Sequence, residues 1–534
     1  MPAQRRHPPC GRPRDRVHGD LRSRRGREGA VNLIGSRGRA VDVRAAVAVC
    51  GTILKYLSVT FVVPALVALW YREPPWPFLA AGAIAAVVGV ALERLEHSHP
   101  RVGLREGFLV VALSWLLWAC FGALPFLFSG DPQLDRPVDV LFETMSGFTT
   151  TGSSILTDIE AVDHSLLLWR QFIQWLGGMG IVVLALAVLP KLRVGGRQMM
   201  ESEAPGPDAA DFLDTIRSTA QRLWLVYIGL TLAQIAILTF FGVVGIDHRM
   251  GLFEAIAAAF ATLPTGGFFT DGQSLAEFSA ATHWVTAIFM VLGGANFALN
   301  YLAFARLKPL RALRDEELRL YLGIIAIATA LVTVEIWATG FAHGEAAVRH
   351  AFFQVVSIMT TTGFASVDFA LWPVLALLVL VFLMFIGGSA GSTGGAIKVV
   401  RHLLVARILR REVRQTLHPE LVEAVRLNGG VVDERTLRAV IAFAFLYIGC
   451  WAAGTAIIVV DSAIQGPSLS ALEAIAATAA TLGNVGPGLG AQGPMGSFEN
   501  FSDISTLTFT GLMWLGRLEL IPVLVLFTRS FWRA

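Results

Sequence analysis

Four short segments of this chain follow one pattern. Each begins with a polar residue, continues apolar for about three helical turns and then becomes rich in threonine or glycine. In each segment 13 residues separate the polar start from a glycine. The segments read DVLFETMSGFTTTG (139–152), EAIAAAFATLPTGG (254–267), HAFFQVVSIMTTTG (350–363) and EAIAATAATLGNVG (473–486). Self-similarity of this kind predicts a repeated architecture, in which each copy is a half-helix followed by an extended strand.

The repeated segments lie between apolar runs that are long enough to cross a membrane. The chain is 54% hydrophobic and only 16% charged, whereas soluble domains carry about 25% charged residues. Because a span needs roughly 20 apolar residues, the four segments are predicted to be re-entrant. These features exclude a soluble enzyme, a disordered protein and a nucleic-acid-binding module. Ten candidate spans cover residues 47–70, 77–92, 107–128, 165–190, 218–243, 282–305, 320–340, 374–410 (broken), 437–460 and 506–530.

Basic residues are distributed unequally between the connecting loops. One set of loops holds 22 Lys and Arg residues, and the opposite set holds only Arg72, Arg136, Arg249 and Arg349. The positive-inside rule therefore predicts that both termini are cytoplasmic and that all four re-entrant segments share one outer mouth. The basic set comprises residues 93–106, 191–222, 306–319 and 398–438.

Residues 1–44 form a basic head with 12 Arg and 4 acidic residues. The head has no apolar periodicity and is predicted to be disordered. One interpretation is a positive flank that keeps the N-terminus inside, or a mis-assigned start codon. The other is an arm that contacts anionic lipid.

Non-helical backbone at membrane depth persists only where it is buried in protein or lines a watery cavity. Four such strands around one axis would present rings of carbonyl oxygens, which can replace the hydration shell of a potassium ion. The half-helices would direct their negative C-terminal ends at the same axis, and glycine permits the backbone angles that aim carbonyls inward.

Longer motifs surround each copy of the pattern. Together they resemble the TrkH/KtrB superfamily of bacterial potassium uptake proteins, and the resemblance is strongest to its TrkH branch. The resemblance covers residues 47–534, and two leading helices before four pore units are typical of that branch. The motifs are FETMSGFTTTGSS, WRQFIQWLGGMGIVVLALAVLP, EAPGP, TAQRLWLVYIGLT, FATLPTGGFF, MTTTGFAS, IGGSAGSTGGAIKVVR, NVGPGLG, NFSDIS and GRLELIPVLVLFTRSFWR.

The resemblance implies an all-α polytopic membrane protein with a pseudo-fourfold ion pore, potassium as the transported ion and no catalytic activity. The implied organisation is a head (1–44), two leading helices (45–95) and four pore repeats (105–192, 216–308, 318–412 and 434–534). In related plant transporters a serine at the first filter glycine favours sodium, and because Gly152 occupies that position here, the resemblance favours potassium. The implied filter residues are Thr150, Thr151, Gly152, Thr265, Gly266, Gly267, Thr361, Thr362, Gly363, Asn484, Val485 and Gly486.

The second span of the third repeat contains a run of glycine and small residues that cannot hold a helix well, because each glycine costs about 1 kcal/mol against alanine. The run predicts a broken helix beneath the filter, and such breaks cluster at ion pathways. The family resemblance implies an intramembrane gate at 387–396; the alternative is a crossing of small-residue helices. The implied gate residues are Gly387, Gly388, Ser389, Gly391, Ser392, Thr393, Gly394, Gly395, Lys398 and Arg517.

Charges inside spans are costly and are usually functional. Arg517 is interpreted as an electrostatic barrier below the filter or, alternatively, as a partner of Glu519 or of nearby backbone. Lys398 is either a pore residue or an ordinary lysine at the cytoplasmic end, and Arg170 is interpreted as contacting lipid headgroups or forming a structural pair. Pro264 departs from the family and is expected to end its half-helix early and to perturb that quarter of the filter.

The family works as homodimers with a cytosolic, TrkA-type, nucleotide-binding regulator, in the bacterial cytoplasmic membrane. This chain carries no nucleotide-binding motif of its own, so no cofactor is expected on it. The acidic stretch DAADFLD (208–214), where the family is usually basic, makes docking of the regulator there less secure.

Two alternative functions are a channel-like subunit of a Kdp-type pump and a sodium-coupled potassium symporter. An intramembrane enzyme would need paired catalytic groups at depth, and the spans hold none so arranged.

Overall fold

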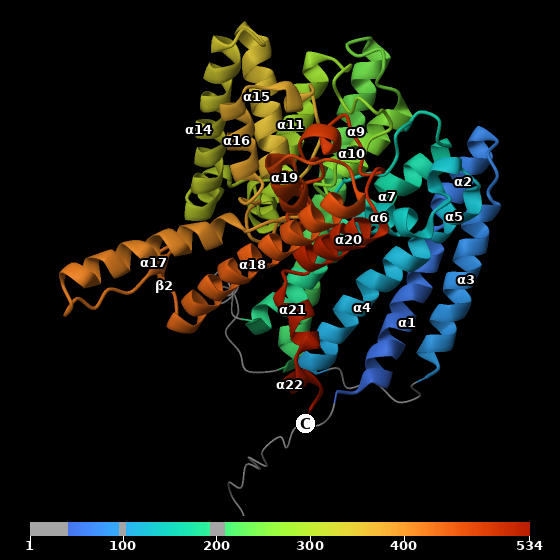
Figure 1. The fold of residues 1–534 in the computed structure, drawn as a ribbon. Helices are drawn as coiled ribbons and strands as arrows, with labels where there is room; N and C mark the ends of the chain where they lie inside the picture. The colour runs from blue at the N-terminus through green and yellow to red at the C-terminus, as the bar shows by residue number, and fades with distance from the viewer. Residues whose placement is uncertain (1–40, 96–102, 193–208, 534) are drawn as a thin grey trace, which may run out of the picture.

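The computed structural model describes residues 41–95, 103–192 and 209–533, and this part of the chain is mostly helical (Figure 1). Most of the basic head (residues 1–40) and the EAPGP segment (203–207) lie outside it. The predicted all-α class holds for the described residues, apart from one two-residue antiparallel hairpin, β1 (Arg426–Leu427) with β2 (Gly430–Val431).

The two leading spans form a tight antiparallel pair. α1 (Val43–Thr60) begins at Asp42, whose side chain accepts a hydrogen bond from the Ala45 amide and so caps the helix. Small residues bring its backbone close to that of α3: a Cβ at Gly51 would lie 2.7 Å from the carbonyl oxygen of Gly89. The unit consists of α1, α2 (Val62–Tyr71) and α3 (Trp76–Glu93).

Four further groups of helices follow, each containing a short half-helix, and we call them units 1 to 4. Unit 1 has α4 (Leu104–Gly122), α5 (Leu124–Ser129), η1 (Pro132–Leu134), α6 (Pro137–Phe148) and α7 (His164–Leu192). Unit 2 has α9 (Ala209–Val244), α10 (Leu252–Thr262), α11 (Ala280–Gly294), α12 (Phe297–Asn300), η2 (Tyr301–Ala305) and α13 (Pro309–Ala312). Unit 3 has α14 (Glu316–Ala338), α15 (Gly344–Met359), η3 (Phe369–Leu371), α16 (Val374–Leu383) and α17 (Val399–Leu417). Unit 4 has α18 (Glu434–Gln465), α19 (Ala471–Leu482), η4 (Gly490–Gln492), α20 (Asp503–Arg517), α21 (Ile521–Leu524), η5 (Val525–Phe527) and α22 (Arg529–Trp532).

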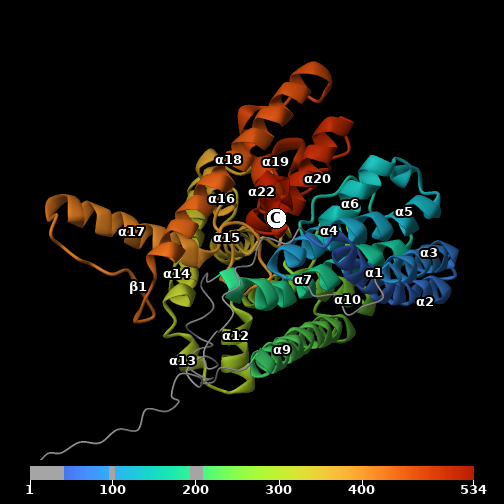
Figure 2. The same cartoon turned by 90° about the horizontal axis from the view of Figure 1, so that it is seen from below.

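The four units surround a common centre, as the view from below shows (Figure 2). Two apolar cores hold them together. The larger core joins units 2, 3 and 4, and the second joins the leading helices, unit 1 and unit 4. The half-helices contribute to these cores, α10, α15 and α19 to the first and α6 and α19 to the second.

Two spans predicted to be continuous are broken. Within the described residues six helices are long and apolar enough to cross a membrane, or up to eight if two bent pairs each count as one span. α11 and α12–η2 meet at 113°, and α20 and α21–η5 meet at 112°. The first break follows Gly294, where Ala295 is extended and Asn296 caps the next helix. At the second break Glu519 and Leu520 both have positive φ. The predictions for 282–305 and 506–530 as unbroken spans were wrong, because an apolar sequence can bend wherever tertiary contacts satisfy the freed backbone groups.

Candidate ion-conduction pathway

The four half-helices end in the same backbone conformation. In each repeated segment, the residue two positions before the final glycine has a left-handed backbone conformation although it is not a glycine. These residues are Thr150 (φ 52°), Thr265 (58°), Thr361 (62°) and Asn484 (54°). The following amide closes a six-residue turn onto the half-helix with an N–O distance of 2.8 Å in every copy. This is the Schellman end of a helix. The donors and acceptors are Thr151 to Ser146, Gly266 to Ala261, Thr362 to Ser357, and Val485 to Ala480.

The four glycines also have positive φ, and they close a ring. Each glycine Cα faces the carbonyl oxygen of the residue before the glycine in the next unit, so a side chain there would collide with neighbouring backbone. An added Cβ would lie 2.1 Å from Gly266 O at Gly152, 2.0 Å from Thr362 O at Gly267, 2.4 Å from Val485 O at Gly363 and 2.7 Å from Thr151 O at Gly486. The contacts run from unit 1 to 2, 2 to 3, 3 to 4 and 4 back to 1, so eight of the twelve residues expected at the filter form a closed ring. The other four, Thr150, Thr265, Thr361 and Asn484, directly precede them in the chain.

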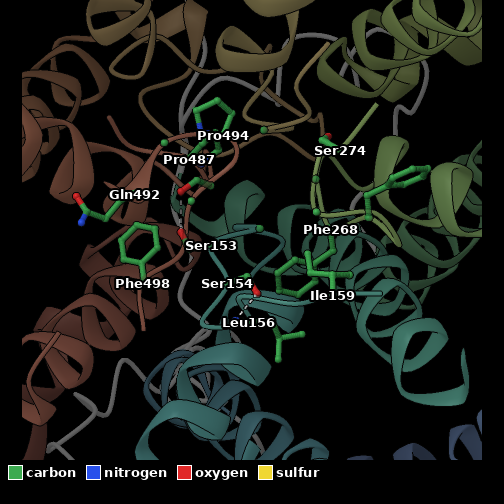
Figure 3. Close-up of a pocket in the computed structure, with 18 of the residues that line it drawn as sticks. Ser153, Ser154, Leu156, Ile159, Phe268, Ser274, Pro487, Gln492, Pro494 and Phe498 are labelled. Atoms are coloured by element: carbon green, nitrogen blue, oxygen red, sulfur yellow. Dashed lines mark hydrogen bonds between the residues drawn. The ribbon is translucent and has the colours of Figure 1, made fainter. Parts of the chain in front are cut away.

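Beyond the glycines a cavity opens that is lined by all four of them. Figure 3 shows Ser153 and Ser154 of unit 1, Phe268 of unit 2, and Pro487 and Phe498 of unit 4 on its walls. Two segments around the cavity are joined directly, because the Phe498 amide donates to the carbonyl of Ser154 at 2.8 Å.

Pro264 leaves the second strand unchanged in conformation. α10 does end early, since its last residue, Thr262, lies five positions before Gly267, whereas the last residue of α6, Phe148, lies four positions before Gly152. Even so, Thr265 and Gly267 keep the φ values of the other copies. The proline ring packs on α7, where a Cβ at Gly178 would lie 2.5 Å from the Pro264 Cβ. The expected perturbation of that quarter is therefore not seen.

The span of unit 3 is broken between α16 and α17, as the glycine run predicted. The two ends of the break are joined: the Gly387 amide donates to Ile397 O at 3.0 Å, and the Val399 amide donates to Gly388 O at 3.2 Å. Residues 387–398 thus form a closed loop, which we call the central loop. Thr393, Gly394 and Gly395 contact the filter strands or the ends of their half-helices. The other residues of the loop that were expected at the gate are Gly387, Gly388, Ser389, Gly391 and Ser392.

The central loop contacts three of the four strands. The Thr393 hydroxyl donates to Leu263 O at 2.9 Å, and the Gly395 amide donates to the Thr361 hydroxyl at 2.7 Å. A Cβ at Gly395 would lie 2.2 Å from Gly483 O, in the fourth copy. The loop also uses the break in unit 2, because the Ser389 amide donates to Gly294 O at 2.8 Å.

Arg517 is buried, with 2% of its surface exposed, and it binds the central loop. Its Nη1 donates to the carbonyl of Thr393 at 2.7 Å, and Nη2 lies 3.5 Å from Gly177 O. Glu519 pairs with Arg401 instead. Lys398 is also buried and donates through Nζ to Gly394 O, so it closes the loop that it terminates.

Three buried groups that support this region were missed or undervalued. Glu317, at the start of α14, accepts hydrogen bonds from the Ala390 amide of the central loop at 2.6 Å and from the Val400 amide at the start of α17 at 3.2 Å. Arg170 forms the structural pair that was one of its two interpretations, with Glu143 at 2.8 Å. Gln174 binds the second strand. For Arg170 and Gln174 the available signal was a polar side chain within an apolar span, whereas Glu317 lies in a loop that the sequence analysis placed outside the spans.

The comparisons with known proteins agree with this architecture. Residues 77–533 match the TrkH family, described as a cation transport protein. The Trk system potassium uptake protein TrkH of Escherichia coli K12 is 37% identical over 497 residues, which cover 92% of this chain and 99% of that protein. The Trk system potassium uptake protein TrkG of the same strain is 33% identical over 499 residues, with 92% and 99% coverage. The crystal structure of the potassium transporter TrkH from Vibrio parahaemolyticus matches with a TM-score of 0.82 and 33% identity, over 92% of this chain and 100% of that one.

The fold and the ring of strands define a polytopic membrane transport protein. The chain belongs to the TrkH family of cation transport proteins. The family resemblance and the fold class expected from the sequence are confirmed, and the activity of this family is transport rather than catalysis.

Proposed function

We propose that this chain takes up potassium across the bacterial cytoplasmic membrane through the ring formed by its four filter strands. The names of relatives that are 33–37% identical over nearly their whole length support potassium as the ion. The single observation that carries the proposal is the cyclic contact of each glycine with the carbonyl of the next unit. A ring of carbonyl oxygens of this kind can replace the hydration shell of a cation.

Potassium is coordinated in this proposal by the backbone of Thr150, Thr151, Gly152, Thr265, Gly266, Gly267, Thr361, Thr362, Gly363, Asn484, Val485 and Gly486. The C-terminal ends of α6, α10, α15 and α19 contribute their partial negative charge to the ring. The proposed repeats are 105–192, 216–308, 318–412 and 434–534. The filter mouth faces the outside and both termini face the cytoplasm, in keeping with the unequal distribution of Lys and Arg.

The central loop, together with Lys398 and Arg517, is the proposed gate. Its hydrogen bonds to Leu263 and Thr361 hold it against one side of the filter, and the charge of Arg517 lies beside it. A closed gate of this kind would block the pathway until the loop moves. Because the chain has no nucleotide-binding motif, we propose that a TrkA-type cytosolic partner moves it, acting on a homodimer of this chain.

Rubidium-86 uptake in a bacterial strain without its own potassium uptake systems tests the proposal. The strain should produce the intact chain, with and without a TrkA-type partner. Uptake should be inhibited by excess potassium but not by excess sodium. Gly363→Ser should reduce uptake at least about ten-fold, because the new Cβ would lie 2.4 Å from Val485 O at a φ of 86°.

Gly323→Ser is the matched control, since a Cβ at Gly323 in α14 meets no heavy atom within 4 Å. This variant should keep the uptake of the intact chain. Sodium-selective uptake by the intact chain, or equal uptake by both serine variants, would contradict the proposal.

A further inference from the structure

Two of the four filter strands carry an internal brace. In the sequence TTTG the first and third threonine hydroxyls are hydrogen-bonded to each other. The Oγ1–Oγ1 distance is 2.7 Å between Thr149 and Thr151 in unit 1 and 2.7 Å between Thr360 and Thr362 in unit 3. All four hydroxyls are buried. A buried hydrogen bond within a strand restricts the peptide planes on which the carbonyl positions depend.

The second strand cannot form this brace. The corresponding residues are Pro264 and Gly266, and neither has a hydroxyl group. The space beside Gly266 is occupied instead by Gln174 of α7, because a Cβ at Gly266 would lie 2.5 Å from the Gln174 Cδ. The Gln174 side chain, which belongs to unit 1, thus occupies the space that a threonine side chain at position 266 would fill.

Gln174 also makes the missing hydrogen bonds. Its Nε2 donates to the Gly266 carbonyl at 2.7 Å, and its Oε1 accepts from the Phe268 amide at 3.2 Å. These two groups flank Gly267, the filter glycine of unit 2. The side chain is fully buried, so bulk solvent does not compete for these two hydrogen bonds in the intact chain.

One turn earlier on the same face of α7, Arg170 holds the continuation of this strand. Its Nη1 donates to Phe269 O at 3.3 Å, and the guanidinium lies 4.2 Å from the centre of the Phe268 ring. Glu143 fixes the arginine with a contact of 2.8 Å, and both side chains are almost fully buried. The carboxylate also accepts from the Ile155 amide at 2.9 Å, so the pair joins the first strand to the second.

The fourth strand shows the same dependence on unit 1. Its residues at the brace positions are Gly483 and Val485, which also lack hydroxyls. Asn484 donates to the Thr151 hydroxyl at 2.9 Å, and the Ser153 hydroxyl donates to Gly486 O at 2.7 Å. Strands with an internal brace thus alternate around the ring with strands held by unit 1.

We propose that Gln174 is a positioning residue for ion selectivity, which supplies from unit 1 the brace that the second filter strand lacks. Arg170 secures the same strand beyond the glycine. The inference rests on the proposed potassium function. It predicts that selectivity depends on a side chain that does not itself contact the ion.

The first test compares two buried glutamines. Gln174→Leu removes both hydrogen bonds at similar volume, and we expect the ratio of rubidium to sodium uptake to fall about ten-fold, equivalent to about 1.4 kcal/mol. Gln234→Leu is the control, because Gln234 of α9 is equally buried but donates to the Thr262 hydroxyl at 2.9 Å rather than to a strand. Gln174→Leu loses two buried hydrogen bonds and Gln234→Leu loses one, so a general loss of stability would lower the uptake of both ions in either variant rather than the ratio between them.

The second test rebuilds the brace within the strand. Pro264→Thr with Gly266→Thr restores the TTTG sequence, but it requires Gln174→Ala to vacate the space. The triple variant should recover the selectivity ratio to within about two-fold of the intact chain. Gln174→Ala alone should lower the ratio, and the two threonine substitutions with Gln174 retained should clash.

The inference is overturned if Gln174→Leu keeps the intact ratio, if Gln234→Leu lowers it as much, or if the triple variant is no more selective than Gln174→Ala. None of these outcomes would touch the proposed function, which fails only if the intact chain shows no preference for rubidium over sodium.

Discussion

Arg517 and Thr393 belong to different units, 124 residues apart, and are joined by a hydrogen bond of 2.7 Å between a guanidinium Nη1 and a backbone carbonyl oxygen. The bond links the bend after α20 to the middle of the central loop. Sequence spacing does not bring the two residues together, although the family resemblance assigned both of them to the gate.

We expect Arg517→Met to raise rubidium uptake in the absence of a regulatory partner. Hydrogen bonds to charged groups contribute about 1.5–3 kcal/mol, so release of the loop corresponds to an increase of about ten-fold or more. Arg529→Met, at an exposed position in α22, should leave basal uptake unchanged. Equal basal uptake by Arg517→Met and the intact chain would show that Arg517 does not hold the loop closed.

Two substitutions of Glu317 distinguish the effect of its charge on the central loop from the effect of its hydrogen bonds. Glu317→Leu removes the acceptor for the Ala390 and Val400 amides and should raise basal uptake several-fold. Glu317→Gln keeps a carbonyl oxygen there and should behave like the intact chain. If the glutamine variant leaks as much as the leucine variant, the negative charge rather than the acceptor anchors the loop.

The buried pair of Glu143 and Arg170 should matter far more to stability than an exposed pair. Glu143→Gln leaves a buried guanidinium without its counter-ion, which costs about 3–5 kcal/mol. Glu423→Gln breaks the pair with Arg414, whose side chains are 36% and 44% exposed, and should cost about 1 kcal/mol or less. Thermal melting of the detergent-solubilised variants measures the difference, and similar melting temperatures would refute it.

Gly177 is required by close packing rather than by backbone conformation. A Cβ there would lie 1.9 Å from the carbonyl oxygen of Phe148 at the end of α6. Gly177→Ala should therefore destabilise the protein by about 1–3 kcal/mol and lower its melting temperature. Gly229→Ala on α9, where a Cβ meets no atom within 4 Å, should not. The claim fails if both alanine variants melt alike.

The half-helices and the break in unit 3 could be predicted, because the residues that determine them are neighbours in the sequence. The half-helices follow from polar starts and apolar runs, and the break at 387–396 follows from consecutive glycines. The bends after Gly294 and Arg517 were not predicted, because the freed carbonyl of Gly294 is satisfied by Ser389 from another unit. A hydropathy pattern contains no information about such a partner.

The residues that support the filter strands could not be predicted from local sequence either. Pro264 was expected to disturb its strand, because proline removes an amide donor. The compensation comes from Gln174, 92 residues away from Gly266 in the sequence, and it becomes visible only when the two units are placed side by side.

The ring of four strands is encoded once, in a single chain. A pore assembled from four identical subunits must accept every substitution in four places at once. In this chain one filter strand can be substituted while the other three strands keep their sequences, and a residue of a neighbouring unit can then change to support the substituted strand. The unlike sequences TTTG, PTGG and GNVG, which share one backbone conformation, are what such independent divergence would leave behind.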